Sequence, residues 1–179
     1  MWLVILIILV VAFTVFIISN IIYNRFQDYI IKLNEVEGKI DETLRSKYDT
    51  IIKANNIIKE KIKTKKEVVD DIEELKDQDI SSFEMYRKLT DSFNKIDYIK
   101  KQYKELNKDE DINKLFYDIN DMDESLSAYI KYYNENIVGY NSFIRKFPYN
   151  LIGIILKYKE KNFFDGKDLN DDNIKDFKL

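Results

Sequence analysis

The sequence predicts an all-α protein in which an N-terminal transmembrane helix continues into an antiparallel bundle of long helices. The first charged side chain is Arg25, so the chain opens with a long uncharged run. Beyond that run, apolar residues recur at steps of three and four, which is the helical period. Four glycines and one proline in 179 residues leave few of the breakers that β-turns need.

Residues 1–22 are predicted to be an uncleaved membrane anchor. Fourteen of the residues from Leu3 to Ile18 are Leu, Ile, Val or Phe, and together they favour insertion by about 4 to 8 kcal/mol. As a helix, Trp2 to Ile22 spans roughly 30 Å, the thickness of the hydrocarbon core. A cleaved signal peptide is the alternative, but it usually has basic residues before a shorter apolar run and a small-residue cleavage site after it.

The charges beside the anchor predict its orientation. Arg25 and Lys32 follow the apolar run, and no basic side chain precedes it. The positive-inside rule then places the bulk of the chain in the cytoplasm and the N-terminus outside. We expect a single-pass protein of the cell membrane.

The composition of the chain disfavours several classes of function. The net charge of −3 disfavours a nucleic-acid partner, because such proteins need a basic excess. The chain has no cysteine and no histidine, so it lacks thiol chemistry and the commonest general base and metal ligand. Asp118, Asp121, Asp123 and Glu124 could attract a divalent cation, but a solvated acidic face is the stronger interpretation. We expect no catalytic residue, no metal site and no cofactor.

Helix boundaries are marked in the sequence. The first helix should run on from the anchor without a break, and Ser81 with Glu84 has the spacing of a capping box at the start of the next. The residues Asn107–Asp111 interrupt the pattern before a last long helix, which Pro148 ends. The apolar stripes of the second and third helices are Tyr86, Leu89, Phe93, Ile96, Ile99, Tyr103 and Leu106, and then Ile112, Leu115, Ile119, Met122, Leu126, Tyr129, Tyr133, Ile137, Tyr140, Ile144 and Phe147.

These limits define a bundle domain over residues 23–164 and a polar, flexible tail over residues 165–179. Two placements of the segment from Phe147 to Phe164 stay open. Its apolar residues and its lysines suit a helix lying on the membrane, and they equally suit a segment that folds back to cap the bundle.

A group of tyrosines and asparagines near the end of the last long helix is the predicted partner-binding site. Tyrosine and asparagine combine rigid contact area with adaptable hydrogen bonds, which suits partner recognition. The alternative, somewhat favoured, is that the tyrosines fill the bundle and the asparagines form hydrogen bonds across helices or hold the terminal turn. The candidate residues are Tyr132, Asn134, Tyr140, Asn141 and Asn150.

The C-terminal third carries a resemblance to a known family. Tyr132-Tyr133-Asn134, Val138-Gly139-Tyr140-Asn141 and Phe147-Pro148-Tyr149-Asn150-Leu151-Ile152 resemble the LemA family, as does the lysine-rich stretch ending in Phe163-Phe164. Tyr23-Asn24, Ile40-Asp41 and Tyr48-Asp49 look like further family positions. The resemblance implies a single-pass, mostly α-helical bacterial membrane protein without an established activity.

Two departures from the family matter. This chain reads Ile51-Ile52-Lys53-Ala54 where the family usually has Ile-Pro-Asn-Leu, so the first helix need not bend. The family's frequent His-Glu is missing as well.

We expect a membrane-anchored interaction or scaffold protein of the bacterial envelope. It should contact the bilayer through residues 1–22, and it should also bind an unknown protein. The alternatives are a structural protein that pairs with copies of itself through its heptad-like stripes to organise the membrane and, less favoured, a metal-dependent enzyme.

Overall fold

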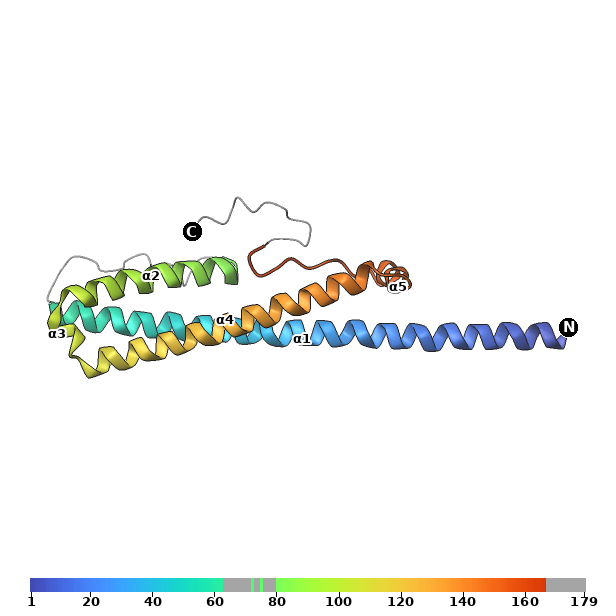
Figure 1. The fold of residues 1–179 in the computed structure, drawn as a ribbon, viewed down its shortest axis with the longest axis horizontal. Coiled ribbons are helices and arrows are strands. Elements are labelled where there is room, and N and C mark those ends of the chain that lie inside the picture. Colours follow the sequence, from blue (N-terminus) through green and yellow to red (C-terminus); the bar gives the residue numbers. More distant parts are fainter. Residues whose placement is uncertain (63–71, 73–74, 76–79, 167–179) are drawn as a thin grey trace. The chain divides into compact units, whose positions relative to one another are not determined.

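A computed structural model of the chain describes residues 1–62, 72, 75 and 80–166. Every element in that part is a helix (Figure 1): α1 (Trp2–Ile62), α2 (Ser82–Gln102), α3 (Lys104–Asn107), α4 (Glu110–Arg145) and α5 (Tyr149–Ile155). The all-α prediction is confirmed. Most of the predicted tail, residues 167–179, lies outside the described residues.

The chain divides into two compact units. The first comprises Met1–Val36 and Tyr132–Leu179, and the second comprises Glu37–Lys131. Both boundaries fall inside helices, one in α1 and one in α4.

Helix α1 continues from the apolar run without a break, as predicted. It passes through Ile51–Ala54, where no proline interrupts its hydrogen bonds. An 18-residue window of this helix has a mean hydropathy of 3.1, and none of the window is buried. Among the described residues, α1 is the one helix long and apolar enough to cross a membrane.

The core of the first unit is aromatic. Ile22, Phe26 and Leu33 of α1 are buried together with Ile137 and Tyr140 of α4. The ring of Phe26 lies 4.9 Å from the rings of both Phe143 and Tyr158, between centroids. Gly139 makes room for this cluster, because a Cβ there would lie 2.9 Å from Cε1 of Tyr29.

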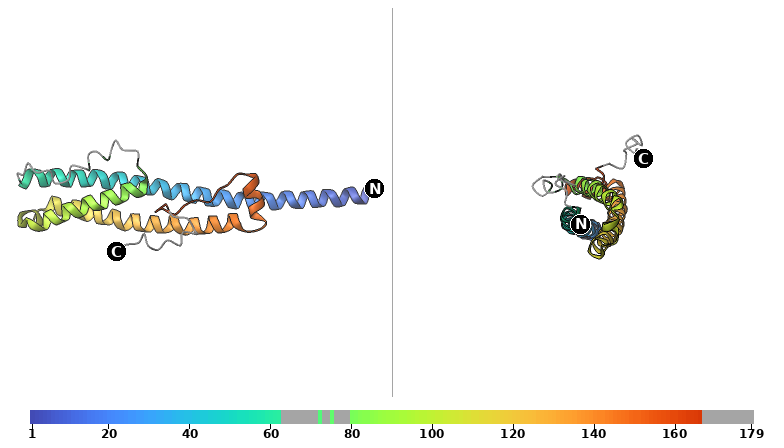
Figure 2. Two further views of the ribbon diagram at one scale, coloured as in Figure 1. Left: turned by 90° about the horizontal axis from the view of Figure 1, so that it is seen from above. Right: turned by 90° about the vertical axis from the view of Figure 1, so that its left-hand side faces the viewer.

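Beyond α4 the chain turns, forms α5 and then runs back along α4 (Figures 1 and 2). We call residues 156–164 the strap. Lys157, with a φ of 57°, lies at the turn where the strap begins. There the N–H of Tyr158 donates to the carbonyl of Gly153 at 2.9 Å, and the N–H of Lys157 donates to the carbonyl of Ile154 at 3.2 Å. This pair of hydrogen bonds closes α5 as a Schellman motif.

The second unit contains the predicted cap. Ser81 Oγ accepts a hydrogen bond from the backbone N–H of Glu84 at 3.2 Å, and α2 begins at the next residue. The core of the second unit is mainly aliphatic, with Leu44 and Ile51 of α1, Leu89 and Ile96 of α2 and Ile119 of α4 all buried.

The predicted stripes fail at helix ends. Tyr103 and Phe147 were expected to face inward, but both are exposed. Helix α2 ends at Gln102 and α4 at Arg145, so neither side chain follows the helical period that predicted its position. Phe116 lies outside the predicted stripe yet is buried against Phe93, with ring centroids 5.1 Å apart.

Candidate functional site

The predicted tyrosine and asparagine residues lie in the first unit, on α4 and α5. Asn141 is buried, and its side-chain amide pairs with the backbone of Lys161 in both directions. Its Nδ2 donates to the Lys161 carbonyl at 2.7 Å, and its Oδ1 accepts from the Lys161 N–H at 2.9 Å. A single side chain therefore satisfies both backbone groups of one strap residue, as a neighbouring β-strand would.

Tyr140 and Asn134 hold the strap on either side of this pair. The hydroxyl of Tyr140 donates to the carbonyl of Lys159 at 3.0 Å, and Asn134 Oδ1 accepts from the N–H of Phe164 at 2.9 Å. Burial, and secondarily the neighbouring Tyr158, raises the pKa of Tyr140. Its hydroxyl thus stays a hydrogen-bond donor well beyond neutral pH.

Two side-chain contacts fix the strap further. Gln27 Nε2 on α1 donates to the hydroxyl of Tyr158 at 2.8 Å. The Arg145 guanidinium holds the Glu160 carboxylate with two hydrogen bonds, of 2.7 and 2.5 Å. This bidentate contact lowers the pKa of Glu160.

The five candidate residues therefore divide into groups. Asn134, Tyr140 and Asn141 bond the strap, whereas Tyr132 is exposed on α4. Asn150 Oδ1 is buried and has no hydrogen-bond partner within the described part of the chain. This arrangement gives three of them the intramolecular role that the sequence offered as the alternative. Partner binding by these residues stays a prediction.

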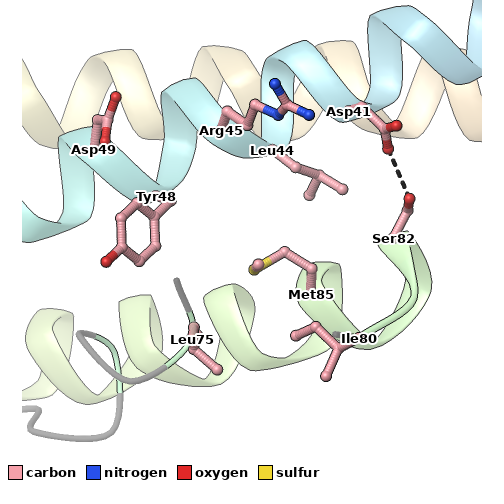
Figure 3. A pocket seen from close by; sticks show the side chains of 9 residues that line it. All are labelled: Asp41, Leu44, Arg45, Tyr48, Asp49, Leu75, Ile80, Ser82 and Met85. Carbon is pink, nitrogen blue, oxygen red and sulfur yellow. Dashed lines mark hydrogen bonds between the residues drawn. The ribbon is translucent and has the colours of Figure 1, made fainter. Parts of the chain in front are cut away.

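A cleft of about 630 Å³ in the second unit was not predicted (Figure 3). Asp41, Arg45 and Asp49 lie on successive turns of α1 along one wall, and Ile80 and Met85 lie opposite. Ser82 Oγ donates to Asp41 at 2.6 Å across the rim. The walls combine apolar side chains with two carboxylates and one guanidinium, which suits a short segment that carries apolar and cationic groups. The sequence signal that could have indicated this cleft is the four-residue spacing of the charged residues Asp41, Arg45 and Asp49.

A buried ion pair in the second unit was also missed. The side chain of Lys47 is fully buried, and its ammonium donates to Asp123 of α4. The same ammonium lies 5.7 Å from the centre of the Tyr86 ring. Burial raises the pKa of Tyr86, and the negative charge of Asp123 adds to that effect. Asp123, which the sequence placed on an acidic face, therefore balances the charge of a core lysine.

Within the described residues, no three side chains among His, Cys, Asp and Glu group closely enough to hold a metal ion. The hydrogen bonds of the first unit fasten a chain segment, and the cleft of the second unit offers a surface.

Comparison with known proteins identifies the family of the chain. No curated protein and no solved structure matches it. The model of the LemA family matches residues 36–175, which is more than half of the chain. The match includes the asparagine and tyrosine residues that hold the strap. The chain therefore belongs to the LemA family.

Proposed function

We propose that the protein is a membrane-anchored scaffold that uses its helices to present a binding surface to another protein. The observation that carries the proposal is the continuity of α1. None of the most apolar 18-residue window of α1 is buried, yet the same helix enters the buried core at Ile22 and Phe26. Removal of the run as a signal peptide would end the chain beside that core, so the geometry favours an anchor that is kept.

The orientation of the anchor is part of the proposal. Arg25 and Lys32 follow the apolar run, and by the positive-inside rule they support a cytoplasmic location of the folded helices. Because the chain has no cysteine, an Asn94→Cys variant carries one thiol, whose labelling shows on which side of the membrane the folded helices lie. We expect a membrane-impermeant maleimide to label it after permeabilisation and to leave it unlabelled in intact cells. Labelling in intact cells would reverse the orientation.

The proposed partner surface is the exposed Tyr132 together with the strap. Asn136, one turn further along α4, donates to the carbonyl of Tyr132, and Asn134 on the same helix holds the end of the strap at Phe164. In this arrangement Asn134 and Asn141 position the surface and Tyr132 contacts the partner. Exposed tyrosines are frequent anchors of protein interfaces.

Photo-crosslinking in intact cells tests this surface. A benzoylphenylalanine replaces one tyrosine at a time: Tyr132, Tyr48 in the cleft, or the exposed Tyr117 of α4 as the matched control. We expect Tyr132 to capture a foreign protein that Tyr117 does not capture. Capture at Tyr48 alone would move the surface to the cleft, and crosslinks to other copies of this chain alone would favour a self-assembling structural protein.

A further inference from the structure

Helix α5 buries one face and exposes the other. Ile152 and Tyr149 pack against the aromatic core of the first unit, and Gly153 is buried close to Ile144 and Phe26. On the remaining face, Leu151, Ile154 and Ile155 are 50, 72 and 75 % exposed. Phe147, just before the helix, is 78 % exposed. Four large apolar side chains in one short segment form a patch that a soluble surface seldom carries.

The position of this patch points to its partner. Ile152, Ile155 and Leu156 line a groove of about 290 Å³ with Phe16, Ser19, Asn20 and Tyr23 of α1. Helix α5 therefore lies beside the last turns of the apolar run, where the run gives way to polar side chains. Tyr23 is exposed at that level, and Trp2 is exposed at the other end of the run. Aromatic residues at both ends of a span typically mark the two membrane surfaces.

The charge of the segment agrees with this position. Residues 145–161 contain five basic side chains (Arg145, Lys146, Lys157, Lys159, Lys161) and one acidic side chain (Glu160), a net charge of +4, whereas the whole chain has −3. Lys146 and Lys157 flank α5 and are exposed. Basic side chains beside an apolar face favour a surface that carries anionic lipids.

We propose that α5 is an interfacial helix, with Leu151, Ile154 and Ile155 in the headgroup region of the bilayer that holds the anchor and with Lys146 and Lys157 against anionic phospholipid headgroups. The inference rests on the membrane anchoring proposed above. It gives the strap a further role, because the hydrogen bonds of Asn141 and Tyr140 fix the segment that follows α5. The first unit would then meet the membrane at two places, the anchor and α5.

Depth-dependent quenching of a fluorophore in the full chain tests the inference. The chain is reconstituted in phosphatidylcholine vesicles with added phosphatidylglycerol, and single cysteines carry the fluorophore. The test position is Ile154→Cys, Phe13→Cys reports the anchor, and the exposed Tyr117→Cys of the second unit is the aqueous control. All three replace exposed side chains, so the fold should tolerate the label.

We expect brominated lipid to quench the label at position 154 as well as the label at position 13, and iodide in the buffer to quench the label at 117. Quenching by lipid at 13 but not at 154 overturns the interfacial helix and leaves the anchor standing. Absence of lipid quenching at 13 overturns the anchor and the inference with it. Protection of position 154 from both quenchers also overturns the inference, because a protein surface would then cover α5.

The lysines have their own test in the same vesicles. With Lys146→Gln and Lys157→Gln, lipid quenching at position 154 should lose its dependence on phosphatidylglycerol, while quenching at position 13 stays the same. Unchanged dependence on phosphatidylglycerol would contradict the headgroup contact.

Discussion

At the scale of single residues, the ion pair of Lys47 and Asp123 should lose very different amounts of stability depending on which partner is replaced. Asp123→Ala leaves a fully buried ammonium without its counter-charge and should lower the free energy of unfolding by about 3 kcal/mol, near the low end for such losses because Asp123 is 31 % exposed. Lys47→Met fills the same space without a charge and leaves unpaired only the partly exposed Asp123, which water can solvate, so it should lower the free energy of unfolding by less than about 1 kcal/mol. Denaturant unfolding of the full chain in detergent, followed by circular dichroism, compares the two. Equal losses would contradict this account.

Asn141 should control how firmly the strap is held. Asn141→Ala removes both hydrogen bonds to Lys161, and local opening of the strap should become roughly tenfold more frequent. Trypsin detects the opening, because it cleaves after Lys157, Lys159 and Lys161. The matched control is Asn136→Ala on the same helix, whose amide donates to the carbonyl of Tyr132. Equal cleavage in the two variants would show that Asn141 does not fasten the strap.

Composition and spacing identified some of these residues and missed others. The tyrosine and asparagine cluster was visible because polar side chains recur at seven-residue steps on a helix. Its partner, the backbone of the strap, was not predictable, since the strap has no periodic pattern and is recognised through its N–H and carbonyl groups. Lys47 was missed, although it lies within the apolar series Leu44, Lys47, Ile51, and a burial pattern alone does not name the acid that pairs with it.

At the scale of the helices, two glycines in long helices should respond in opposite ways to alanine. A Cβ at Gly38 of α1 meets no atom within 4 Å, so Gly38→Ala should stabilise the protein by about 1 kcal/mol through helix propensity. A Cβ at Gly139 would press against the Tyr29 ring. The cost of displacing this ring should exceed the gain in helix propensity, so Gly139→Ala should destabilise the protein by about 1 kcal/mol. Thermal unfolding of the pair checks the signs. Stabilisation by both would contradict the close packing at Tyr29.

The start of α4 should give an acid-sensitive contribution. Asp109 Oδ1 accepts from the N–H of Ile112 at 3.0 Å, and the hydrogen bond from Lys61 lowers the pKa of Asp109 below its ordinary 3.8. Since the folded pKa is the lower one, this stabilisation is complete above about pH 4 and is lost as the pH falls through the lowered pKa. Asp109→Ala should therefore cost about 1 kcal/mol at neutral pH and less in acid. A difference that does not change with pH would contradict the role of the carboxylate.

Helix starts were better predicted than helix ends. Ser81 and Glu84 predict the start of α2, because a capping box needs particular side chains at a fixed spacing. Pro148 marks the end of α4 only approximately, because a proline also restricts the residue before it and the helix already stops at Arg145. The two residues expected inside, Tyr103 and Phe147, fall in these last few positions.

At the scale of the whole molecule, the sequence predicted the continuous first helix but not the two units. Continuity follows from the absence of proline between the apolar run and Ile62, where Gly38 is a single glycine within a helical pattern. The unit boundaries lie inside α1 and α4, where no change in composition marks them. Family membership agrees with a helical protein that carries an apolar N-terminal helix, and it leaves the scaffold role to experiment.

Alkaline extraction of isolated membranes, with the intact mass of the chain, tests the anchor most directly. We predict that the chain stays in the membrane pellet and that its mass includes residues 1–22. As a control, Leu9→Arg with Phe13→Arg places two charges in the run, at about 3 kcal/mol each, and should release the chain. A chain found in the supernatant, or one shortened by the apolar run, would contradict a membrane-anchored scaffold.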